Sequence, residues 1–257
     1  MTTPKEYNKL IKTILIIGNT FAVDQIAKII NKYNDGNIEI KKIDYISQLQ
    51  LFSADSLKGA RLISCCSTYI VPPDILSALG FGAYNFHPGP PEYPGWAPFC
   101  FASYHGATSF GATAHLMTEK VDAGPIIGVE SFAVTPATSA EELTFQTFNA
   151  LLRLFESLAE RLLQDPTPLP SLPVAWGPKR TTKKQFAQFC ALPPDIKGEE
   201  MIRRVRAFGI GDGLCRPSLQ WGGERYVLAE ADGEEDNRQG EETITLHSIR
   251  FTKVKKS

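Results

Sequence analysis

Short apolar runs of strand length alternate with segments of helical periodicity through the first two-thirds of this chain. The run at 13–17 (TILII) is wholly apolar, and the run at 60–66 (ARLISCC) is nearly so. Between them, the segment 21–33 (FAVDQIAKIINKY) places Val23, Ile26 and Ile30 at helical spacing. Strands that alternate with helices are typical of an α/β protein whose sheet is mainly parallel.

The other expected elements continue this alternation. We predict strands at 37–43, 60–66, 82–87, 110–117 and 125–134, and short helices at 72–80 and 97–106. A long helix is predicted at 138–164, with Thr138-x-x-Glu141 as its capping box. One apolar stripe runs along this helix and consists of Phe148, Leu151, Leu152, Phe155, Leu158 and Leu162.

A proline-rich stretch divides the chain. Four prolines occur within 165–173 (DPTPLPSLP), which cannot hold a helix or a central strand. We therefore expect a catalytic domain at 1–165, a linker at 166–175 and a small α+β tail at 176–257. The tail is predicted to contain a helix at 198–209, a hairpin at 217–232 that turns at Gly222–Gly223, a mobile, solvated loop at 232–242 and a strand at 242–254.

Composition limits the class of protein. The 257 residues are 43% hydrophobic and 21% charged, which is typical of a soluble protein with a core, and the net charge of −1 gives no overall attraction to nucleic acid or anionic membrane. The apolar runs are too short to span a membrane, and the polar N-terminus does not have the form of a secretory signal. The five cysteines, Cys65, Cys66, Cys100, Cys190 and Cys215, are odd in number and form no C-x-x-C pair. We expect reduced thiols and a cytoplasmic protein.

The stretch AYNFHPGPPEYPG at 83–95 is the first candidate for a functional site. Asn85 and His87 are two residues apart, so on a strand both side chains point to one side and Phe86 points to the other. Pro88 then ends any hydrogen-bonded ladder. This pattern predicts a strand that places two polar groups at its carboxyl end.

Asp122 is the second candidate. It follows the predicted strand 110–117, and functional groups collect at the carboxyl ends of strands in open parallel sheets. If Asp122 lies beside His87, the histidine can take a proton, the carboxylate can orient its ring, and Asn85 can donate to a developing oxyanion. Each residue alone also fits an ordinary turn, surface or core position, so spacing leaves both interpretations open.

These residues resemble a known family. Asn85-Phe86-His87 with its Pro/Gly loop, followed by HLMTEKVDAGPII at 115–127, is similar to the formyltransferases that use 10-formyltetrahydrofolate. The resemblance spans about 13–165 and is most specific over 82–127. It implies a Rossmann-like fold with helices on both faces of the sheet, catalytic roles for Asn85, His87 and Asp122, and no metal.

The resemblance also implies a folate pocket. The segment STYIVP at 67–72 matches a family segment near the pterin, whereas the loop after His87 has Gly-Pro-Pro-Glu where the family has a Ser-Leu-Leu-Pro-like sequence. The residues expected to contact folate are Ile70, Val71, Gly89, Pro90, Pro91, Glu92 and Val121.

The sequence gives less information on the molecule that accepts the formyl group. The segments KRTTKKQF and MIRRVRAF resemble methionyl-tRNA formyltransferase, but residues 176–257 hold 15 Lys and Arg against 12 Asp and Glu, a weak surplus for tRNA binding. The short tail is more similar to the sugar N-formyltransferases, which favours a nucleotide-linked 4-amino-4,6-dideoxy sugar for O-antigen or lipopolysaccharide synthesis, with GDP-perosamine as the particular choice. Trp176 would stack on the base, and Lys179 and Arg180 would meet the diphosphate.

Alternatives remain open at this point. The first is a methionyl-tRNA formyltransferase, and the second is an inactive folate- or nucleotide-binding module. A formyl-folate hydrolase is a minor further alternative. The sequence is compatible with a homodimer and does not decide the oligomeric state.

Overall fold

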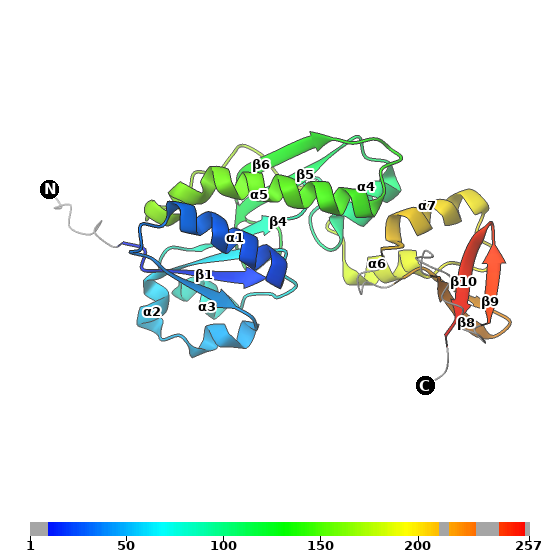
Figure 1. The fold of residues 1–257 in the computed structure, drawn as a ribbon, viewed down its shortest axis with the longest axis horizontal. Coiled ribbons are helices and arrows are strands. Elements are labelled where there is room, and N and C mark those ends of the chain that lie inside the picture. The colour runs from blue at the N-terminus through cyan, green and yellow to red at the C-terminus, as the bar shows by residue number, and fades with distance from the viewer. Residues whose placement is uncertain (1–9, 211–215, 230–241, 255–257) are drawn as a thin grey trace. The chain divides into compact units, whose positions relative to one another are not determined.

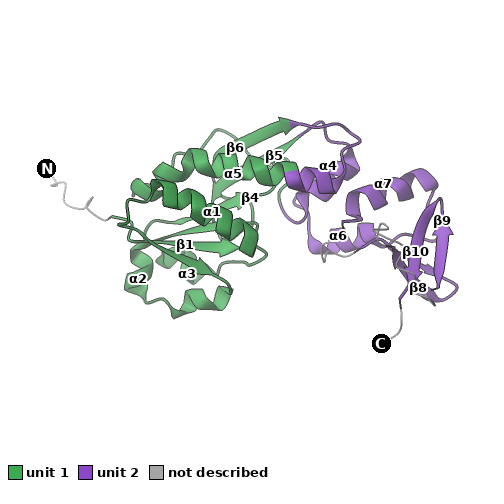
Figure 2. Ribbon diagram, viewed as in Figure 1, with its two compact units in different colours: residues 1–94, 110–132, 146–178 green, residues 95–109, 133–145, 179–257 purple. Residues whose placement is uncertain are grey.

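The computed structural model of the chain describes residues 10–210, 216–229 and 242–254. It divides into two compact units, which Figure 2 shows in green and purple. The first unit comprises residues 1–94, 110–132 and 146–178, and the second comprises residues 95–109, 133–145 and 179–257.

The first unit is built on a six-stranded sheet with the strand order β2-β1-β3-β4-β5-β6 (Figure 1). Strands β2, β1, β3 and β4 pair in parallel, as the alternating sequence pattern predicts. The strands are β1 (Thr13–Gly18), β2 (Glu39–Ile43), β3 (Ala60–Cys65), β4 (Ala83–His87), β5 (Ser109–Leu116) and β6 (Ile126–Ala133).

Helices cover both faces of this sheet, which confirms the predicted Rossmann-like α/β class. Alternate residues of β1 face opposite sides. Ile14 and Ile16 pack with α1 and α5, whereas Leu15 and Ile17 pack with η1, α2 and α3. The helices are α1 (Thr20–Tyr33), the 3-10 helix η1 (Ile46–Leu51), α2 (Ala54–Lys58), α3 (Pro73–Ala78) and α5 (Ala140–Gln164), and the sequence prediction missed η1 and α2.

The pairing of β4 with β5 differs from the sequence expectation in one respect. The two strands are antiparallel, so the carboxyl end of β5 lies beside the start of β4, with Leu116 opposite Tyr84. The argument that placed Asp122 near His87 because both strands end at one edge was therefore wrong. The chain turns back after β5, where Leu116 N donates to Pro125 O at 2.9 Å.

The capping box predicted at the start of α5 was wrong by one residue. The capping box is formed one residue later than predicted, by Ser139 and Glu142 rather than by Thr138 and Glu141. Glu142 N donates to Ser139 Oγ at 3.1 Å, and Ser139 N donates to Glu142 Oε2 at 2.8 Å. Thr138 instead accepts from Thr135 N with its hydroxyl, at 3.1 Å.

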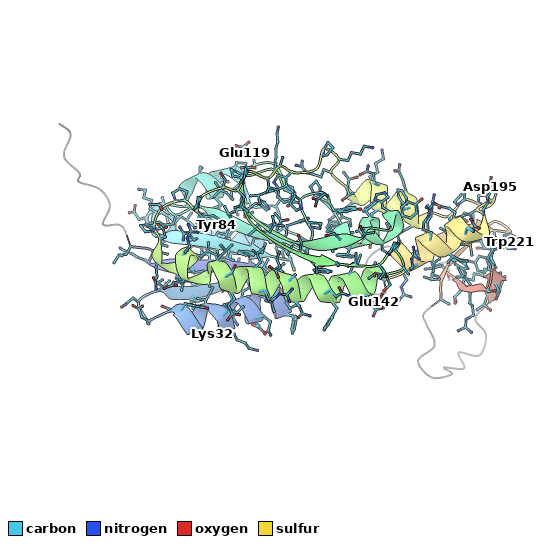
Figure 3. All side chains as sticks on the ribbon, turned by 90° about the horizontal axis from the view of Figure 1, so that it is seen from above. Lys32, Tyr84, Glu119, Glu142, Asp195 and Trp221 are labelled. Atoms are coloured by element: carbon cyan, nitrogen blue, oxygen red, sulfur yellow. The ribbon has the colours of Figure 1, made fainter. Side chains whose placement is uncertain are left out.

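The proline-rich stretch is held against the first unit at two points. Leu169 N donates to Tyr84 Oη at 3.2 Å, and Leu172 N donates to Ile126 O at 2.7 Å. Tyr84 is labelled in Figure 3 and is only 1% exposed. The stretch has neither helix nor strand, as predicted, and its path leads to Trp176.

The second unit carries a four-stranded antiparallel sheet with the order β7-β8-β10-β9, which confirms the predicted α+β tail. The predicted hairpin turns at Gly222 and Gly223, whose φ angles of 58° and 81° suit glycine. The predicted single strand at 242–254 was wrong, because the chain reverses at His247 and Ser248. The elements are α4 (Pro98–His105), α6 (Lys183–Cys190), α7 (Gly198–Phe208), β7 (Ser218–Trp221), β8 (Glu224–Leu228), β9 (Thr243–Leu246) and β10 (Ile249–Lys253).

Two further expectations concern the whole chain. Cys65, Cys100 and Cys190 are buried and Cys66 is half-buried, and Cys215 lies outside the described residues. Most of the loop predicted at 232–242 also lies outside them. Within the part of the chain that the structure describes, no helix combines the length and apolar character that a membrane crossing requires.

Candidate active site

The end of β4 presents its residues as the sequence predicts. Phe86 is fully buried and packs edge-on against Phe155 of α5, with ring centroids 4.9 Å apart. Asn85 and His87 alternate with Phe86 and therefore project from the opposite face of the sheet. His87 is 4% exposed, so its imidazole is almost completely removed from solvent.

The two ring nitrogens of His87 face two different acceptors. Nε2 lies 3.0 Å from the carbonyl oxygen of Tyr93, and Nδ1 lies 3.4 Å from Asp122 Oδ2. A carbonyl oxygen can only accept, so Nε2 carries a proton in this arrangement. The Nδ1 separation is longer than an ordinary hydrogen bond. The neutral ring therefore presents its lone pair at Nδ1, on the Asp122 side.

Burial controls the charge of His87. It lowers the pKa of the imidazole below its ordinary value of 6.5, and the Asp122 carboxylate and the Tyr93 carbonyl offset only part of this effect. His87 is therefore neutral near pH 7 and can accept a proton. When Nδ1 takes that proton, the carboxylate 3.4 Å away stabilises the resulting imidazolium.

Asp122 is held in place by an unusual backbone conformation. Its φ angle is 44°, in the left-handed region that few residues other than glycine adopt, and its side chain is 4% exposed. Two residues later, Gly124 lies so close to Leu116 that a Cβ would sit 1.8 Å from the Leu116 carbonyl oxygen. The turn after β5 is thus specific to a residue without a side chain at 124, and it brings the carboxylate back to the histidine.

His115 is a site residue that the sequence reasoning missed. It lies directly across from Asn85 in the β4–β5 register, and its Nε2 is 3.1 Å from Asn85 Nδ2 and 3.4 Å from Asp122 Oδ1. The side chain is 2% exposed. His115 begins the segment HLMTEKVDAGPII, but only the antiparallel register shows that it faces Asn85.

Trp176 reaches this group from the proline-rich stretch. Its ring packs edge-on against His87 and His115, with centroid distances of 5.7 Å and 5.0 Å. Its Nε1 donates to Gly124 O at 2.9 Å. Trp176 therefore forms one wall of the histidine site within the first unit.

Lys179 and Arg180 belong to the second unit, and both are exposed. They follow Trp176 by three and four residues, so the chain limits their Cα separation from it to about 11 Å and about 14 Å. The segment that carries them is tied to the start of this unit, because Trp96 N donates to Thr181 O at 3.0 Å and Thr181 Oγ1 donates to Trp96 O at 2.7 Å.

The residues expected to contact folate divide into two groups. Gly89, Pro90 and Pro91 are buried, and their carbonyls accept from Thr113 Oγ1, Tyr93 N and Gly177 N respectively. These bonds fix the loop after β4. Val71 is also buried, in the core beneath α3, whereas Ile70 and Val121 are 69% and 44% exposed and Glu92 is exposed.

This arrangement provides the groups that acyl transfer requires. His87 is a neutral base, the Asp122 carboxylate is placed to stabilise its protonated form, and Asn85 offers amide N–H groups beside them. Among the residues that the structure describes, no set of three or more His, Cys, Asp and Glu side chains has a geometry suited to a metal ion. A Rossmann-like sheet with this set at the end of β4 is an arrangement suited to the class of group-transfer enzymes.

The comparisons with known proteins agree with that class. Residues 44–151 match the family model described as formyl transferase. Three solved structures share the fold. A 4-N formyltransferase from Francisella tularensis is 18% identical, with a TM-score of 0.68 over 88% of this chain and 99% of that one. Methionyl-tRNA formyltransferase from Clostridium thermocellum is 18% identical, with a TM-score of 0.61 over 88% of this chain and 95% of that one.

The third, WlaRD, is a sugar 3N-formyl transferase whose structure was solved in the presence of dTDP and 5-N-formyl-THF. It is 14% identical, with a TM-score of 0.61 over 95% of this chain and 97% of that one. At these identities the three structures establish a shared fold. The family match covers the central segment of the chain, and this segment contains Asn85, His87, His115 and Asp122. The chain therefore has the fold of these formyltransferases and carries a segment, 44–151, that matches the formyl transferase family model.

Proposed function

We propose that the protein transfers the formyl group of 10-formyltetrahydrofolate to the amino group of a nucleotide-linked amino sugar. The observation that carries this proposal is the placement of His87, Asp122 and Asn85 within one buried site inside the formyl transferase segment. A 4-amino-4,6-dideoxy sugar is the acceptor class that we favour, and GDP-perosamine is the first member to test. This would place the enzyme in O-antigen synthesis in the cytoplasm.

His87, Asp122 and Asn85 each have a separate role in the proposed reaction. The acceptor amine attacks the formyl carbon, and the Nδ1 lone pair of His87 takes the proton that the amine loses. Asp122 stabilises the imidazolium so formed. Asn85 donates an amide N–H to the oxygen that becomes negative in the tetrahedral intermediate, a contribution that is typically worth about 100- to 1000-fold in rate. The intermediate then collapses as the bond between the formyl carbon and N10 of the folate breaks. The His87 imidazolium returns its proton to N10, so that tetrahydrofolate leaves neutral and the histidine is regenerated.

The described residues fit a folate donor in two ways. Ile70 and Val121 expose apolar side chains to solvent, and each offers a surface of the kind on which a flat pterin ring packs. The loop with Ile70 follows β3, whose Ser64 and Cys65 pair in parallel with Asn85 and Phe86, so this loop begins at the same sheet edge as the site. The presence of 5-N-formyl-THF in one structural relative supports the same donor class.

Two features favour a sugar nucleotide as the acceptor. Lys179 and Arg180 are exposed cations three and four residues beyond Trp176 in the sequence, and a diphosphate would be paired well by them. The whole chain carries a net charge of −1, which gives little general attraction to tRNA. The dTDP in a relative's structure supports a nucleotide-linked substrate.

Incubation with formyl-folate and a panel of amino-sugar nucleotides tests this proposal. We expect mass spectrometry to show a formylated sugar nucleotide for at least one member, with release of tetrahydrofolate in equal amount. The panel varies the base and the position of the amino group separately, so that each is identified independently. Formation of product only with a non-amino sugar, or of formate without product, would reject the proposed acceptor.

Methionyl-tRNA is the second candidate acceptor, since a methionyl-tRNA formyltransferase shares the fold. It predicts no reaction with any free sugar nucleotide and a binding constant for tRNA that falls steeply with salt. A gel-shift series with initiator tRNA at several salt concentrations separates the two candidates. An inactive binding module predicts neither product nor tetrahydrofolate release with either acceptor.

A further inference from the structure

Asn85 can serve as an oxyanion donor only if its amide is oriented with the NH2 group towards the reacting oxygen. An amide presents a donor on one side and an acceptor on the other, and a rotation of 180° exchanges them. Some neighbour must therefore distinguish the two orientations. Asn85 Nδ2 lies 3.1 Å from His115 Nε2.

The proton on Nδ1, the other ring nitrogen of His115, decides whether Nε2 donates or accepts in this contact. Nδ1 lies 2.9 Å from the carbonyl oxygen of Leu116, which can only accept, so Nδ1 carries the proton. In the neutral ring, Nε2 then has a lone pair and accepts from the Asn85 NH2 group. The reversed amide would place its oxygen against that lone pair, with no proton between them.

The position of His115 makes this contact rigid. The residue is directly opposite Asn85 in the β4–β5 ladder, and only 2% of it is exposed. The Trp176 ring packs edge-on against the imidazole at 5.0 Å, and Asp122 Oδ1 lies 3.4 Å from Nε2. The Asn85 contact is shorter than the Asp122 contact, which fits an Nε2 that accepts from the amide rather than one that donates to the carboxylate.

We propose that His115 is a positioning residue that locks the amide of Asn85 in its donating orientation. One amide N–H is held by His115 Nε2, and the second is left for the oxyanion. His115 acts on catalysis through Asn85 and does not itself touch the reacting atoms. The inference rests on the proposed formyl transfer.

A double-mutant cycle tests this coupling. We expect His115→Phe, which keeps a ring but has no acceptor, to lower kcat about tenfold with little change in KM, since the amide is needed mainly in the transition state. His115→Gln, whose side-chain oxygen can accept from Asn85, should recover most of that loss. In an Asn85→Ala background, His115→Phe should change kcat by less than about twofold. The exposed His247 provides the matched control, and His247→Gln should leave kcat unchanged.

The possible outcomes separate the roles. A loss of equal size in the wild-type and Asn85→Ala backgrounds would overturn the proposal in favour of a packing role. A loss that disappears only in an Asp122→Asn background would overturn it in favour of action through the carboxylate. Circular dichroism and thermal unfolding of each variant identify any that fail to fold, and in that case the comparison of His115→Gln with wild type carries the test.

A measurement independent of turnover separates this inference from the proposed function. Long-range proton–nitrogen NMR of the wild-type protein should show His115 protonated at Nδ1 and bare at Nε2, and the Asn85 NH2 signals should shift in His115→Gln but not in His247→Gln. A proton found on Nε2 at neutral pH would overturn the inference even if formyl transfer is confirmed. Absence of formyl transfer with the predicted NMR result would instead reject the proposed function.

Discussion

Each unit of the protein contains a cluster of titratable residues, and the two clusters differ in what controls the pKa of their central residue. In the first unit, His87 is almost fully buried, and the loss of solvent lowers its pKa despite the nearby Asp122. In the second unit, burial raises the pKa of Glu200, but hydrogen bonds from Arg203, Arg204 and Tyr104 outweigh it and hold that pKa at about 2.

The difference shows what each cluster is suited to do. His87 is kept neutral next to a carboxylate, so it can change its charge during a reaction. Glu200 is kept permanently charged, and its partners join α7 to α4, where Tyr104 Oη donates to Glu200 Oε1 at 2.8 Å. Changes in the first cluster should therefore alter turnover with little effect on folding, and changes in the second should do the reverse.

The largest expected effect comes from His87. His87→Asn should lower kcat by at least about 100-fold, because the variant has no group that can take the amine proton at neutral pH. Folding should be little affected, since the residue sits at the end of β4. Steady-state kinetics with the acceptor found by the panel measures the rate, and thermal unfolding serves as the control. Turnover within a fewfold of wild type would remove His87 from the mechanism.

Asp122→Asn should have the next largest effect and should also move the pH profile. Asparagine tolerates the left-handed backbone at this position, so the substitution removes charge and leaves the turn intact. Asp122 raises the pKa of His87, so its removal lowers that pKa further and shifts the acid limb of kcat/KM to lower pH. The weaker base should reduce the plateau about tenfold. An acid limb that stays in place or moves to higher pH would show that Asp122 does not tune His87.

The cations after Trp176 test whether the second unit contributes only to stability. We expect the double variant Lys179→Ala/Arg180→Ala to raise the KM for the sugar nucleotide about tenfold, because each charged contact to a diphosphate is worth roughly 1 kcal/mol or less in an exposed setting. The KM for formyl-folate should change by less than twofold. Substitution of the exposed Lys184 is the matched control. An unchanged acceptor KM would show that another segment binds the phosphates.

Glu200→Gln should give the smallest effect and should act on stability alone. The cluster is partly exposed, with 24% of the Glu200 side chain and 49% of the Arg203 side chain open to solvent, so screening limits the loss in the free energy of unfolding to about 1 kcal/mol. The pKa of Glu200 is lowered from 4.5 to about 2, so its contribution is complete above pH 4.5 and is lost as the pH falls towards 2. Urea unfolding of both proteins across that range should show the difference shrinking. A change in kcat at neutral pH would contradict the separation of the two clusters.

The features that the sequence predicted best are those set by local pattern. Apolar runs and helical spacing predicted the parallel strands, the covering helices and the turn at Gly222–Gly223, because each depends on neighbouring residues. The positions of Asn85 and His87 on one face of a strand follow from the same local rule. The short helices at 46–51, 54–58 and 183–190 were missed, since each is too brief to show a clear period.

The features that the sequence did not predict depend on contacts between distant segments. Arg61 lies in an apolar run, and only the fold shows that its fully buried guanidinium donates to the carbonyls of Phe81, Leu162 and Asp165. His115 is similar, because its pairing with Asn85 requires the antiparallel register of β4 and β5. Asp122 was proposed from its position after the strand predicted at 110–117 and from a family resemblance, while the path that brings it to His87 became clear only in the structure.

The most direct test of this account is product formation by the wild-type enzyme beside the Asn85→Ala/His87→Asn double variant. Each protein is incubated with formyl-folate and, in separate reactions, with the sugar-nucleotide panel or with methionyl-tRNA, and the acceptor is analysed by mass spectrometry. We predict a formylated amino-sugar nucleotide with the wild type and almost none with the folded double variant. Equal product from both proteins, or formylated methionyl-tRNA as the only product of the wild type, would contradict the account.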